Sequence, residues 1–139
     1  MEQGGGEFGR TPLDASLTGQ VIGCAMEVHR HLGPGLLESV YEECLCRELA
    51  DREVPFERQM MVPLTYKSRP IDAAYRIDLL VAKRVIVEIK AVEKLLPIHE
   101  AQVLTYMRLA QIPLGLLLNF QNVVLRHGIR RLSLKPPPT

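Results

Sequence analysis

The first half of the chain carries two amphipathic helical patterns separated by a Gly-Pro-Gly break. Over Leu17–Leu32, apolar residues recur at intervals of three and four, which predicts a first helix. The break, Gly33–Gly35, ends this helix, because Gly admits a left-handed cap and Pro cannot continue the helical hydrogen bonds. A second helical pattern begins at Leu36 and ends near Asp51. Two helices are therefore expected to open the fold.

The second half changes to the pattern of strands. Three segments rich in β-branched and aromatic residues, separated by short polar turns, predict a meander: Met60–Tyr66, Ile71–Val81 and Arg84–Ile89. Helical spacing returns over His99–Ala110, and Pro113 marks the end of that helix. Leu114–Phe120 is typical of a buried strand, and a last short strand is expected over Gly128–Leu134.

The predicted order, α-α-β-β-β-α-β-β, indicates an α/β fold in which helices pack on a mixed central sheet, forming an αβ sandwich. The length of 139 residues and the hydrophobic share of 47% fit one domain. We expect the packed core to span residues 17–134. The Gly-rich and polar residues 1–16 are expected to form a flexible N-terminal segment, and residues 135–139 a Pro-rich tail.

Charge and hydropathy limit the partners and the cellular location that we expect for the protein. The 17 Lys and Arg nearly balance the 16 Asp and Glu, so there is no global basic field. Residues 71–139, however, hold 10 basic and 5 acidic residues, which suits contact with a polyanion. The strongly apolar stretch Ile112–Phe120 is far shorter than the roughly 20 residues that span a bilayer. Residues 1–10 lack the pattern of a secretion signal, so we expect a cytoplasmic protein without membrane association.

Charged residues interrupt two of the predicted strands. Glu88 and Lys90 alternate with apolar neighbours in one strand, so both side chains lie on one face. If the preceding hairpin is centred on Lys83, residues whose numbers sum to 166 lie opposite each other, which places Asp78 against Glu88. Two carboxylates directly opposite each other on neighbouring strands destabilise a sheet unless a cation lies between them or one is protonated. A divalent cation such as Mg²⁺ or Mn²⁺ resolves the conflict, whereas the alternative is an ordinary cross-strand salt-bridge cluster with Lys90.

The chain also resembles a known family. Gly35-Leu36-Leu37-Glu38-Ser39-Val40-Tyr41 is similar to the signature of the GxxExxY protein family, and Asp78 with Glu88-Ile89-Lys90 resembles the D…E-x-K core of the PD-(D/E)XK nuclease superfamily. His99-Glu100-Ala101-Gln102 and the Gln102…Tyr106 pair resemble motifs that accompany such cores, as does the strand Gly115–Phe120. The resemblance covers about Leu17–Leu134.

This resemblance implies a restriction-endonuclease-like fold and a site for phosphodiester hydrolysis. In it, Asp78 and Glu88 would be metal ligands and Lys90 the catalytic lysine. Glu38 would be an additional catalytic and metal-binding acid that reaches the site from its helix. Residues in supporting roles would be Tyr41, His99, Gln102 and Tyr106.

Some of these residues have simpler explanations. Glu38 lies at the edge of the apolar stripe, where an exposed acid near a helix N-terminus is favoured by the helix dipole. Gln102 and Tyr106 share a helix face, which also fits a polar rim. His99 fits either a phosphate contact or a helix cap.

The predicted function is a Mg²⁺- or Mn²⁺-dependent nuclease that acts on nucleic acid, on DNA in preference to RNA, with a homodimer as an expected assembly. The basic residues expected to contact phosphates are Lys83, Arg84, Arg126, Arg130 and Arg131. These cations are equally typical of a solvated basic surface. The alternatives are a non-catalytic module that binds nucleic acid or protein on the same fold, and a purely structural or oligomeric role.

Overall fold

The computed structural model describes residues 12–134, and its elements follow the predicted order. They are the helices α1 (Pro12–Leu32), α2 (Glu38–Asp51) and α3 (Pro97–Ala110), the 3₁₀ turn η1 (Leu125–Gly128), and the strands β1 (Phe56–Tyr66), β2 (Arg69–Val81), β3 (Val85–Lys90), β4 (Leu114–Asn119) and β5 (Ile129–Ser133). The first helix begins earlier than expected, so residues 12–16 are helical; the rest of the predicted N-terminal segment and the Pro-rich tail lie outside the described residues. Within residues 12–134, no helix is long and apolar enough to cross a membrane.

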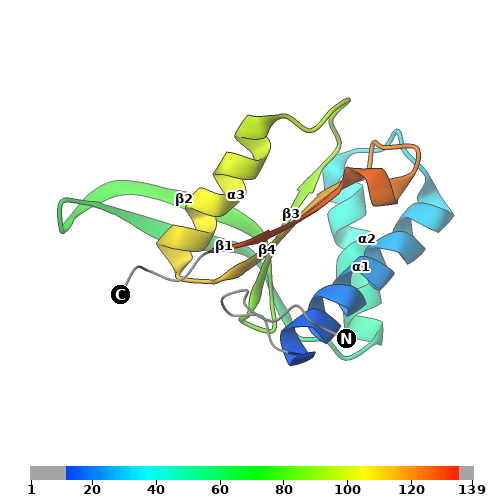
Figure 1. Ribbon diagram of the computed structural model, residues 1–139, viewed down its shortest axis with the longest axis horizontal. Helices are drawn as coiled ribbons and strands as arrows, with labels where there is room; N and C mark the ends of the chain where they lie inside the picture. The colour runs from blue at the N-terminus through cyan, green and yellow to red at the C-terminus, as the bar shows by residue number, and fades with distance from the viewer. Residues whose placement is uncertain (1–11, 135–139) are drawn as a thin grey trace.

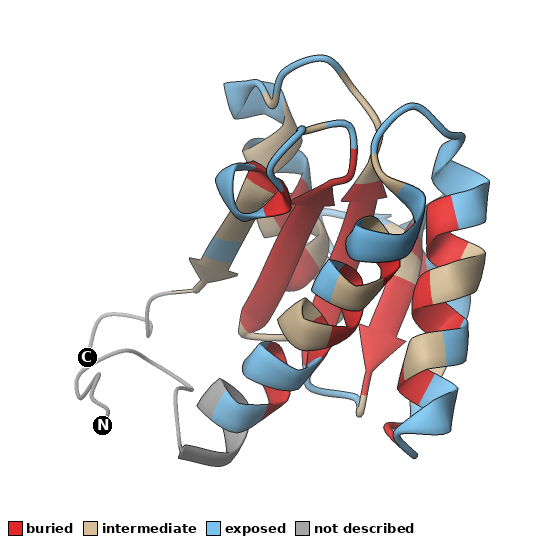
Figure 2. Ribbon diagram, turned by 90° about the vertical axis from the view of Figure 1, so that its right-hand side faces the viewer, coloured by how far each residue is buried: buried red, intermediate tan, exposed pale blue. Residues whose placement is uncertain are grey.

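The five strands form one mixed sheet in the order β1-β2-β3-β4-β5. Only β3 and β4 run parallel, because α3 connects them, and the other neighbouring strands are antiparallel. Helices α1 and α2 lie together on one side of the sheet and α3 on the other (Figure 1). Burial follows this layering (Figure 2). The central strands are buried, whereas each helix is buried on the side that faces the sheet and exposed on the other.

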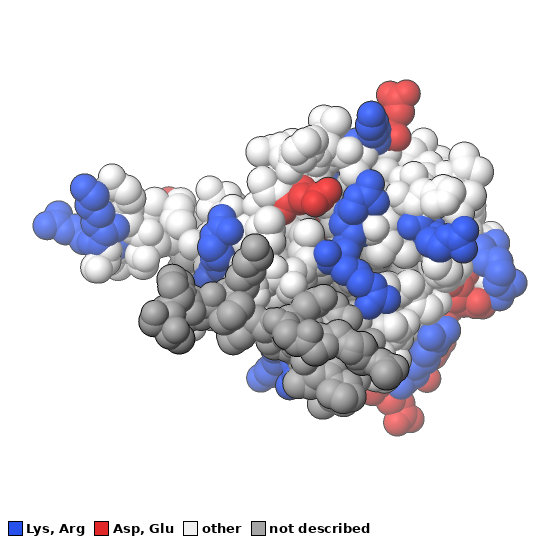
Figure 3. Space-filling model, in the orientation of Figure 1, with Lys and Arg blue, Asp and Glu red and all other residues white. Residues whose placement is uncertain are grey.

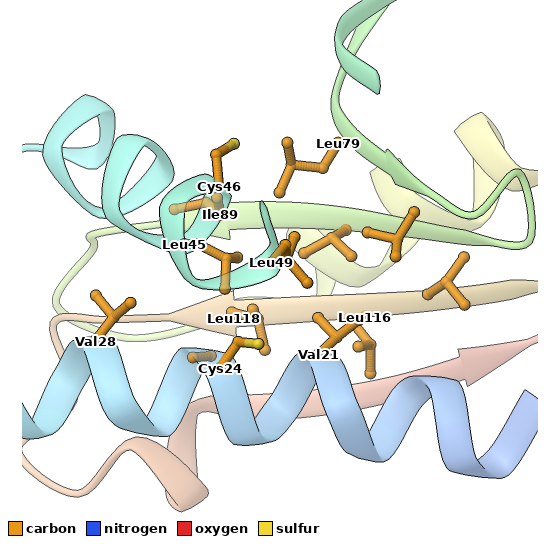
Figure 4. Packing of buried hydrophobic residues seen from close by; sticks show 14 of the residues in the cluster. Val21, Cys24, Val28, Leu45, Cys46, Leu49, Leu79, Ile89, Leu116 and Leu118 are labelled. Atoms are coloured by element: carbon orange, nitrogen blue, oxygen red, sulfur yellow. The ribbon is translucent and has the colours of Figure 1, made fainter. Parts of the chain in front are cut away.

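A large apolar cluster fills the space between the sheet and the helices α1 and α2. Val21, Cys24 and Val28 project from α1 toward Leu116 and Leu118 of β4 (Figure 4). The corresponding residues of α2 are Leu45, Cys46 and Leu49. Burying such side chains stabilises the fold by roughly 1.5–3 kcal/mol each. This cluster anchors the two helices to the strands that carry the acidic residues.

The second helix begins later than its apolar pattern predicts. Leu36 and Leu37 precede α2 and are exposed, so they do not form the start of its buried face. The Gly-Pro-Gly turn is held instead by Tyr41, whose hydroxyl donates to the Gly33 carbonyl at 2.6 Å and accepts from the Leu36 N–H at 3.1 Å. The tyrosine ring stacks on Phe120, with centroids 4.6 Å apart. This contact sets where α2 starts, and hence where Glu38 lies.

Asn119 holds the end of β4 against the loop that follows β3. It is fully buried, its Oδ1 accepts from the Val92 N–H at 3.0 Å, and its Nδ2 donates to the Val92 carbonyl at 2.9 Å. Its Nδ2 also donates to the Asn122 side chain at 2.8 Å. Gly128 closes this region: a Cβ atom there would lie 2.7 Å from the Asn119 carbonyl oxygen and 2.5 Å from Asn122 Oδ1.

Gly128→Ala is therefore expected to destabilise the protein by about 1–3 kcal/mol, because a backbone carbonyl cannot move aside as a flexible side chain can. Urea unfolding measures the change. Gly19→Ala is the matched control, since a Cβ atom at this exposed position of α1 meets nothing within 4 Å. It should stabilise the helix by up to about 1 kcal/mol. Equal stability of the two variants would contradict the close packing at Gly128.

Candidate active site

The sheet forks at Asp78. Strand β2 pairs with β3 only through Leu79↔Val87, Leu80↔Ile86 and Val81↔Val85, whereas it stays paired with β1 far beyond this point. The numbers of each β2–β3 pair sum to 166, so the predicted register is confirmed. Counting back from the hairpin turn, Asp78 is thus the first residue of β2 that no longer pairs with β3. Glu88 is the corresponding residue of β3.

Two carboxylates occupy the fork and replace the backbone hydrogen bonds that end there. The Asp78 N–H donates to Glu88 Oε2 at 2.9 Å, and the Ile89 N–H donates to Asp78 Oδ2 at 2.9 Å. Buried backbone N–H groups need partners, so these bonds hold both acids in place. Each bond uses one oxygen of its carboxylate, and the Oδ1 and Oε1 atoms are left out of the pair of bonds.

The alternation of faces along β2 also breaks at this fork. Leu79 and Val81 face the α1–α2 cluster, but Ile77 packs on the α3 side although its number is also odd. Strand β1 shows the matching irregularity, because Gln59, between the pairs Arg58↔Leu79 and Met60↔Ile77, has a φ of 53°. Positive φ is uncommon outside Gly and marks a local distortion. The kink turns the rest of the hairpin out of the sheet.

The electrostatics of the site follow from burial and from crowding of negative charge. Burial and the neighbouring Asp78 carboxylate raise the pKa of Glu88 to about 8. Burial also raises the pKa of Asp78, opposed by the hydrogen bond from Ile89; the charges of Glu42 and Glu38 raise it further. Lys90 lowers the pKa of both acids, which places its positive charge within range of them. Glu88 is only 5% exposed, so water screens this repulsion poorly.

Three further groups belong to this neighbourhood. Glu38, the exposed first residue of α2, acts on both acids through its charge. Tyr106 of α3 is half-buried, and its pKa is raised by burial and by the charges of Glu88 and Asp78. Its ring lies 5.5 Å from that of Tyr75 in β2. The fork therefore brings acids, an amine and a phenol to one end of the sheet.

A comparison with protein-family models decides the family. The model of the PD-(D/E)XK nuclease superfamily matches residues 15–132, which is most of the chain. The protein belongs to the PD-(D/E)XK nuclease superfamily. No curated protein and no solved structure matches the chain.

The fold agrees with this membership. A mixed five-stranded sheet between helices is the restriction-endonuclease-like arrangement of PD-(D/E)XK nucleases, and it was predicted from the sequence. The narrower likeness to the GxxExxY family stays a prediction. Within this nuclease fold, Tyr41 is buried and holds the turn before α2, so the structure gives it a supporting role in the scaffold.

The structure places the residues of α3 unequally. His99 caps the helix. Its ring Nδ1 accepts from the Leu96 backbone N–H at 2.9 Å, and its backbone N–H donates to the Leu96 carbonyl at 2.9 Å. Gln102 is exposed, one turn before Tyr106. Of the two interpretations of His99, the structure supports the helix cap.

The basic residues that were expected to contact phosphates do not form one surface. Lys83 and Arg84 lie in the β2–β3 turn, at the opposite end of β3 from Lys90. The C-terminal arginines divide between the two faces of the sheet. Arg130 pairs with Glu100 of α3 at 3.6 Å, Arg131 donates to Thr18 Oγ1 of α1 at 3.1 Å, and Arg126 lines a groove of about 490 Å³ on the α1 side.

One acid beside the site was missed by the sequence reasoning. Glu42 is 7% exposed, accepts from Gln59 Nε2 at 2.9 and 2.8 Å, and pairs with Arg58 at 3.2 Å. It ties α2 to β1 where the strand kinks, and its charge reaches Asp78. The available signal was its spacing: Glu42 follows Glu38 by one helical turn, so both acids share a face of α2.

The donor set suits a hard divalent cation. Among residues 12–134, no three His, Cys, Asp or Glu side chains form a ready metal cluster. Asp78 and Glu88 nevertheless place two carboxylates together, and Mg²⁺ is commonly held by one or two carboxylates while water and substrate phosphate complete its shell. Burial is the main reason that the pKa values of both acids are raised, and neighbouring carboxylates raise them further; a cation would offset that negative charge. The residues present therefore fit the metal dependence that is general in this superfamily.

The stability of the metal-free protein should fall as the pH rises toward about 8. The ordinary pKa of Glu is about 4.3, so between that value and about 8 the folded state keeps a proton on Glu88 that the unfolded state has lost. That contribution is complete below about pH 4.3 and is lost as the pH passes about 8. Glu88→Gln, which imitates the neutral acid, should flatten the slope and raise the melting temperature near pH 8 by several degrees.

Thermal unfolding in EDTA across this pH range measures the effect. Glu93→Gln, at an exposed position after β3, serves as the control and should keep the slope of the unaltered protein. Parallel pH profiles for Glu88→Gln and the unaltered protein would show that Glu88 is not held in a proton-retaining environment.

Proposed function

We propose that this member of the PD-(D/E)XK superfamily is a divalent-metal-dependent nuclease that hydrolyses phosphodiester bonds of nucleic acid. The observation that carries the proposal is the pair Asp78–Glu88 at the fork of the sheet, with Lys90 on the same face as Glu88. Superfamily membership over residues 15–132 supports the reaction class. An ordinary salt-bridge cluster does not account for an acid that is almost completely buried beside a second acid.

Asp78 and Glu88 would hold the ion, with Glu38 as a further acid from α2. Bound Mg²⁺ or Mn²⁺ supplies two effects: it polarises a phosphoryl oxygen and lowers the pKa of water. The protein's own contribution is to fix the two carboxylates. Hydrogen bonds from the N–H groups of Asp78 and Ile89 fix one oxygen of each, so little reorganisation is needed when the other oxygens meet a cation.

Lys90 would stabilise the negative charge that develops on the phosphate. In the reaction a water oxygen bonds to phosphorus while the bond from phosphorus to the leaving sugar oxygen breaks. The half-buried ammonium of Lys90 lies within electrostatic range of both acids, so it can approach a phosphate that binds the ion they would hold. Tyr106 offers a hydroxyl from α3, and Gln102 is an exposed amide one turn earlier on that helix. DNA as the preferred substrate and a homodimer as the assembly stay predictions.

The proposal predicts cleavage that depends on both metal and side chains. The unaltered protein is incubated with duplex DNA, single-stranded DNA and RNA in Mn²⁺, Mg²⁺ or EDTA. We expect cleavage in either metal and none in EDTA. Glu88→Gln and Lys90→Met should each lower the rate at least about a hundredfold, because the first removes a carboxylate that would hold the ion and the second removes the positive charge that would act on the reacting phosphate.

Asp51→Asn, an exposed acid at the end of α2, is the control and should cleave like the unaltered protein. The unaltered protein and its three variants are purified in parallel, so a contaminating nuclease would give equal cleavage rates in all four preparations. That result, or nucleic-acid binding without any turnover, would refute the proposal; the second would favour the non-catalytic binding module.

A further inference from the structure

Beyond the fork, β1 and β2 continue as a two-stranded arm, defined here as residues 60–77. It leaves the body of the molecule next to the acidic pair, at the left of Figure 1. Pairing runs from Met60↔Ile77 to Tyr66↔Arg69, which at about 3.3 Å per residue gives a length of roughly 20 Å. An arm of this length can follow about six steps of duplex nucleic acid at 3.4 Å each.

Only the base of the arm packs against the rest of the protein. Val62 is buried in the apolar cluster between the sheet and α3, called the α3 cluster, which includes Ile86 and Met107. Tyr75, the partner of Val62 in the pairing, contacts the Tyr106 ring. The next pair, Met61↔Arg76, lies on the opposite face, and both residues are exposed. One face of the arm is therefore covered at its base by α3, and the other is open.

The exposed side chains of the arm combine positive charge with large apolar groups. Residues 60–77 contain three cations and one acid, namely Lys67, Arg69, Arg76 and Asp72. All four are exposed, and Lys and Arg side chains gather at the end of the arm (Figure 3). Lys67 also lies over the ring of Tyr66, 5.5 Å from its centroid, and that ring is 64% exposed. A polyanion with planar groups complements this surface.

The backbone of the arm argues against a second copy of the chain as its occupant. Strand β1 is the edge of the sheet, and an edge strand can pair with another chain. Strand β2 is also an edge along the arm, because β3 pairs with it only at residues 79–81. Each strand has a proline, which lacks an N–H, namely Pro63 in β1 and Pro70 in β2, and the register shifts between Pro63 and Thr65. Both features interrupt the regular edge that strand-to-strand pairing requires. Charge complementarity with phosphate therefore decides the occupant.

We infer that the arm is a second contact surface for nucleic acid, in which Arg76 near the base and Lys67 and Arg69 at the tip hold backbone phosphates that flank the bond that is cut. The inference rests on the proposed function and adds to it the place where the flanking substrate binds. It follows from continuity: the arm begins at Ile77, next to Asp78, and its base touches Tyr106. A strand bound along the arm leads into the fork.

The test separates binding from cleavage. Binding to fluorescently labelled duplex DNA, single-stranded DNA and RNA is measured by anisotropy in EDTA, with Glu88→Gln as the parent protein. Adding Lys67→Gln, Arg69→Gln and Arg76→Gln should weaken binding at least about tenfold for the preferred probe. It should also reduce the slope of log affinity against log salt by about 0.9 per cation on duplex DNA, or about 0.7 on a single strand.

The matched control removes three cations from the helix layer, with Arg30→Gln, Arg47→Gln and Arg52→Gln in the same parent. These arginines are exposed and form surface ion pairs within or just after their own helices, so their loss costs little stability. The affinity of this control variant for the nucleic-acid probe should stay within about twofold of that of the parent protein. Circular dichroism confirms that both variants are folded. Equal affinity of the arm and control variants would overturn the inference, as would the absence of binding by the parent.

Two other results distinguish the arm from the active site. In the metal-loaded protein with Glu88 intact, the three arm substitutions should raise KM rather than lower kcat; cleavage with unchanged KM would refute the arm while leaving the proposed function standing. Binding that depends on the arm in a protein that never cleaves would support the arm and refute the proposed function. Sedimentation tests whether a second copy of the chain binds the arm. A dimer that the arm substitutions dissociate, with nucleic-acid affinity unchanged, would overturn the inference.

Discussion

The arrangement of the site depends on one constraint, the need to satisfy backbone N–H groups where β2 parts from β3. At this fork the N–H groups of Asp78 and Ile89 lose their strand partners and donate to carboxylates instead. Leaving a buried N–H unpaired costs about 1–3 kcal/mol, so these bonds oppose any movement of the acids away from each other. The same constraint starts the arm, because the kinked hairpin can leave the sheet only once this pairing has ended.

The fork explains why like charges remain together in a buried place. The apolar cluster under α1 and α2 fixes β3, and the α3 cluster fixes the other face, so Glu88 cannot turn to solvent without disturbing a packed strand. Glu42 adds negative charge near Asp78, although Arg58 and Gln59 bind its own carboxylate. Without a cation, protonation of Glu88 relieves the repulsion. A divalent ion would do so at higher pH, where nucleic-acid hydrolysis gains from activated water.

The sequence predicted what depends on periodicity. Alternation along β3 placed Glu88 and Lys90 on one face, and the centre of the hairpin at Lys83 gave the observed β2–β3 register. The break in alternation between Ile77 and Leu79 could not be predicted, because it accompanies the left-handed φ of Gln59 and the contact of Gln59 with Glu42. These residues are distant in sequence and meet only in the folded chain.

Single side chains were harder to assign than strands, since one pattern fits several partners. Tyr41 belongs to the quoted motif, yet its hydroxyl holds the turn at Gly33. Arg130 and Arg131 were both expected to contact phosphates, but they are neighbours in β5, and alternation along the strand sends them to opposite faces of the sheet.

The most direct test of the central claim is a calorimetric titration of the protein with Mn²⁺ near pH 8. If Asp78 and Glu88 hold the ion, the unaltered protein will bind Mn²⁺ at a discrete site. Asp78→Asn and Glu88→Gln will each weaken that binding at least about tenfold, whereas Asp51→Asn will not change it. Equal Mn²⁺ affinity in all four proteins would show that the fork is not a metal site, and the account of the active site would be wrong.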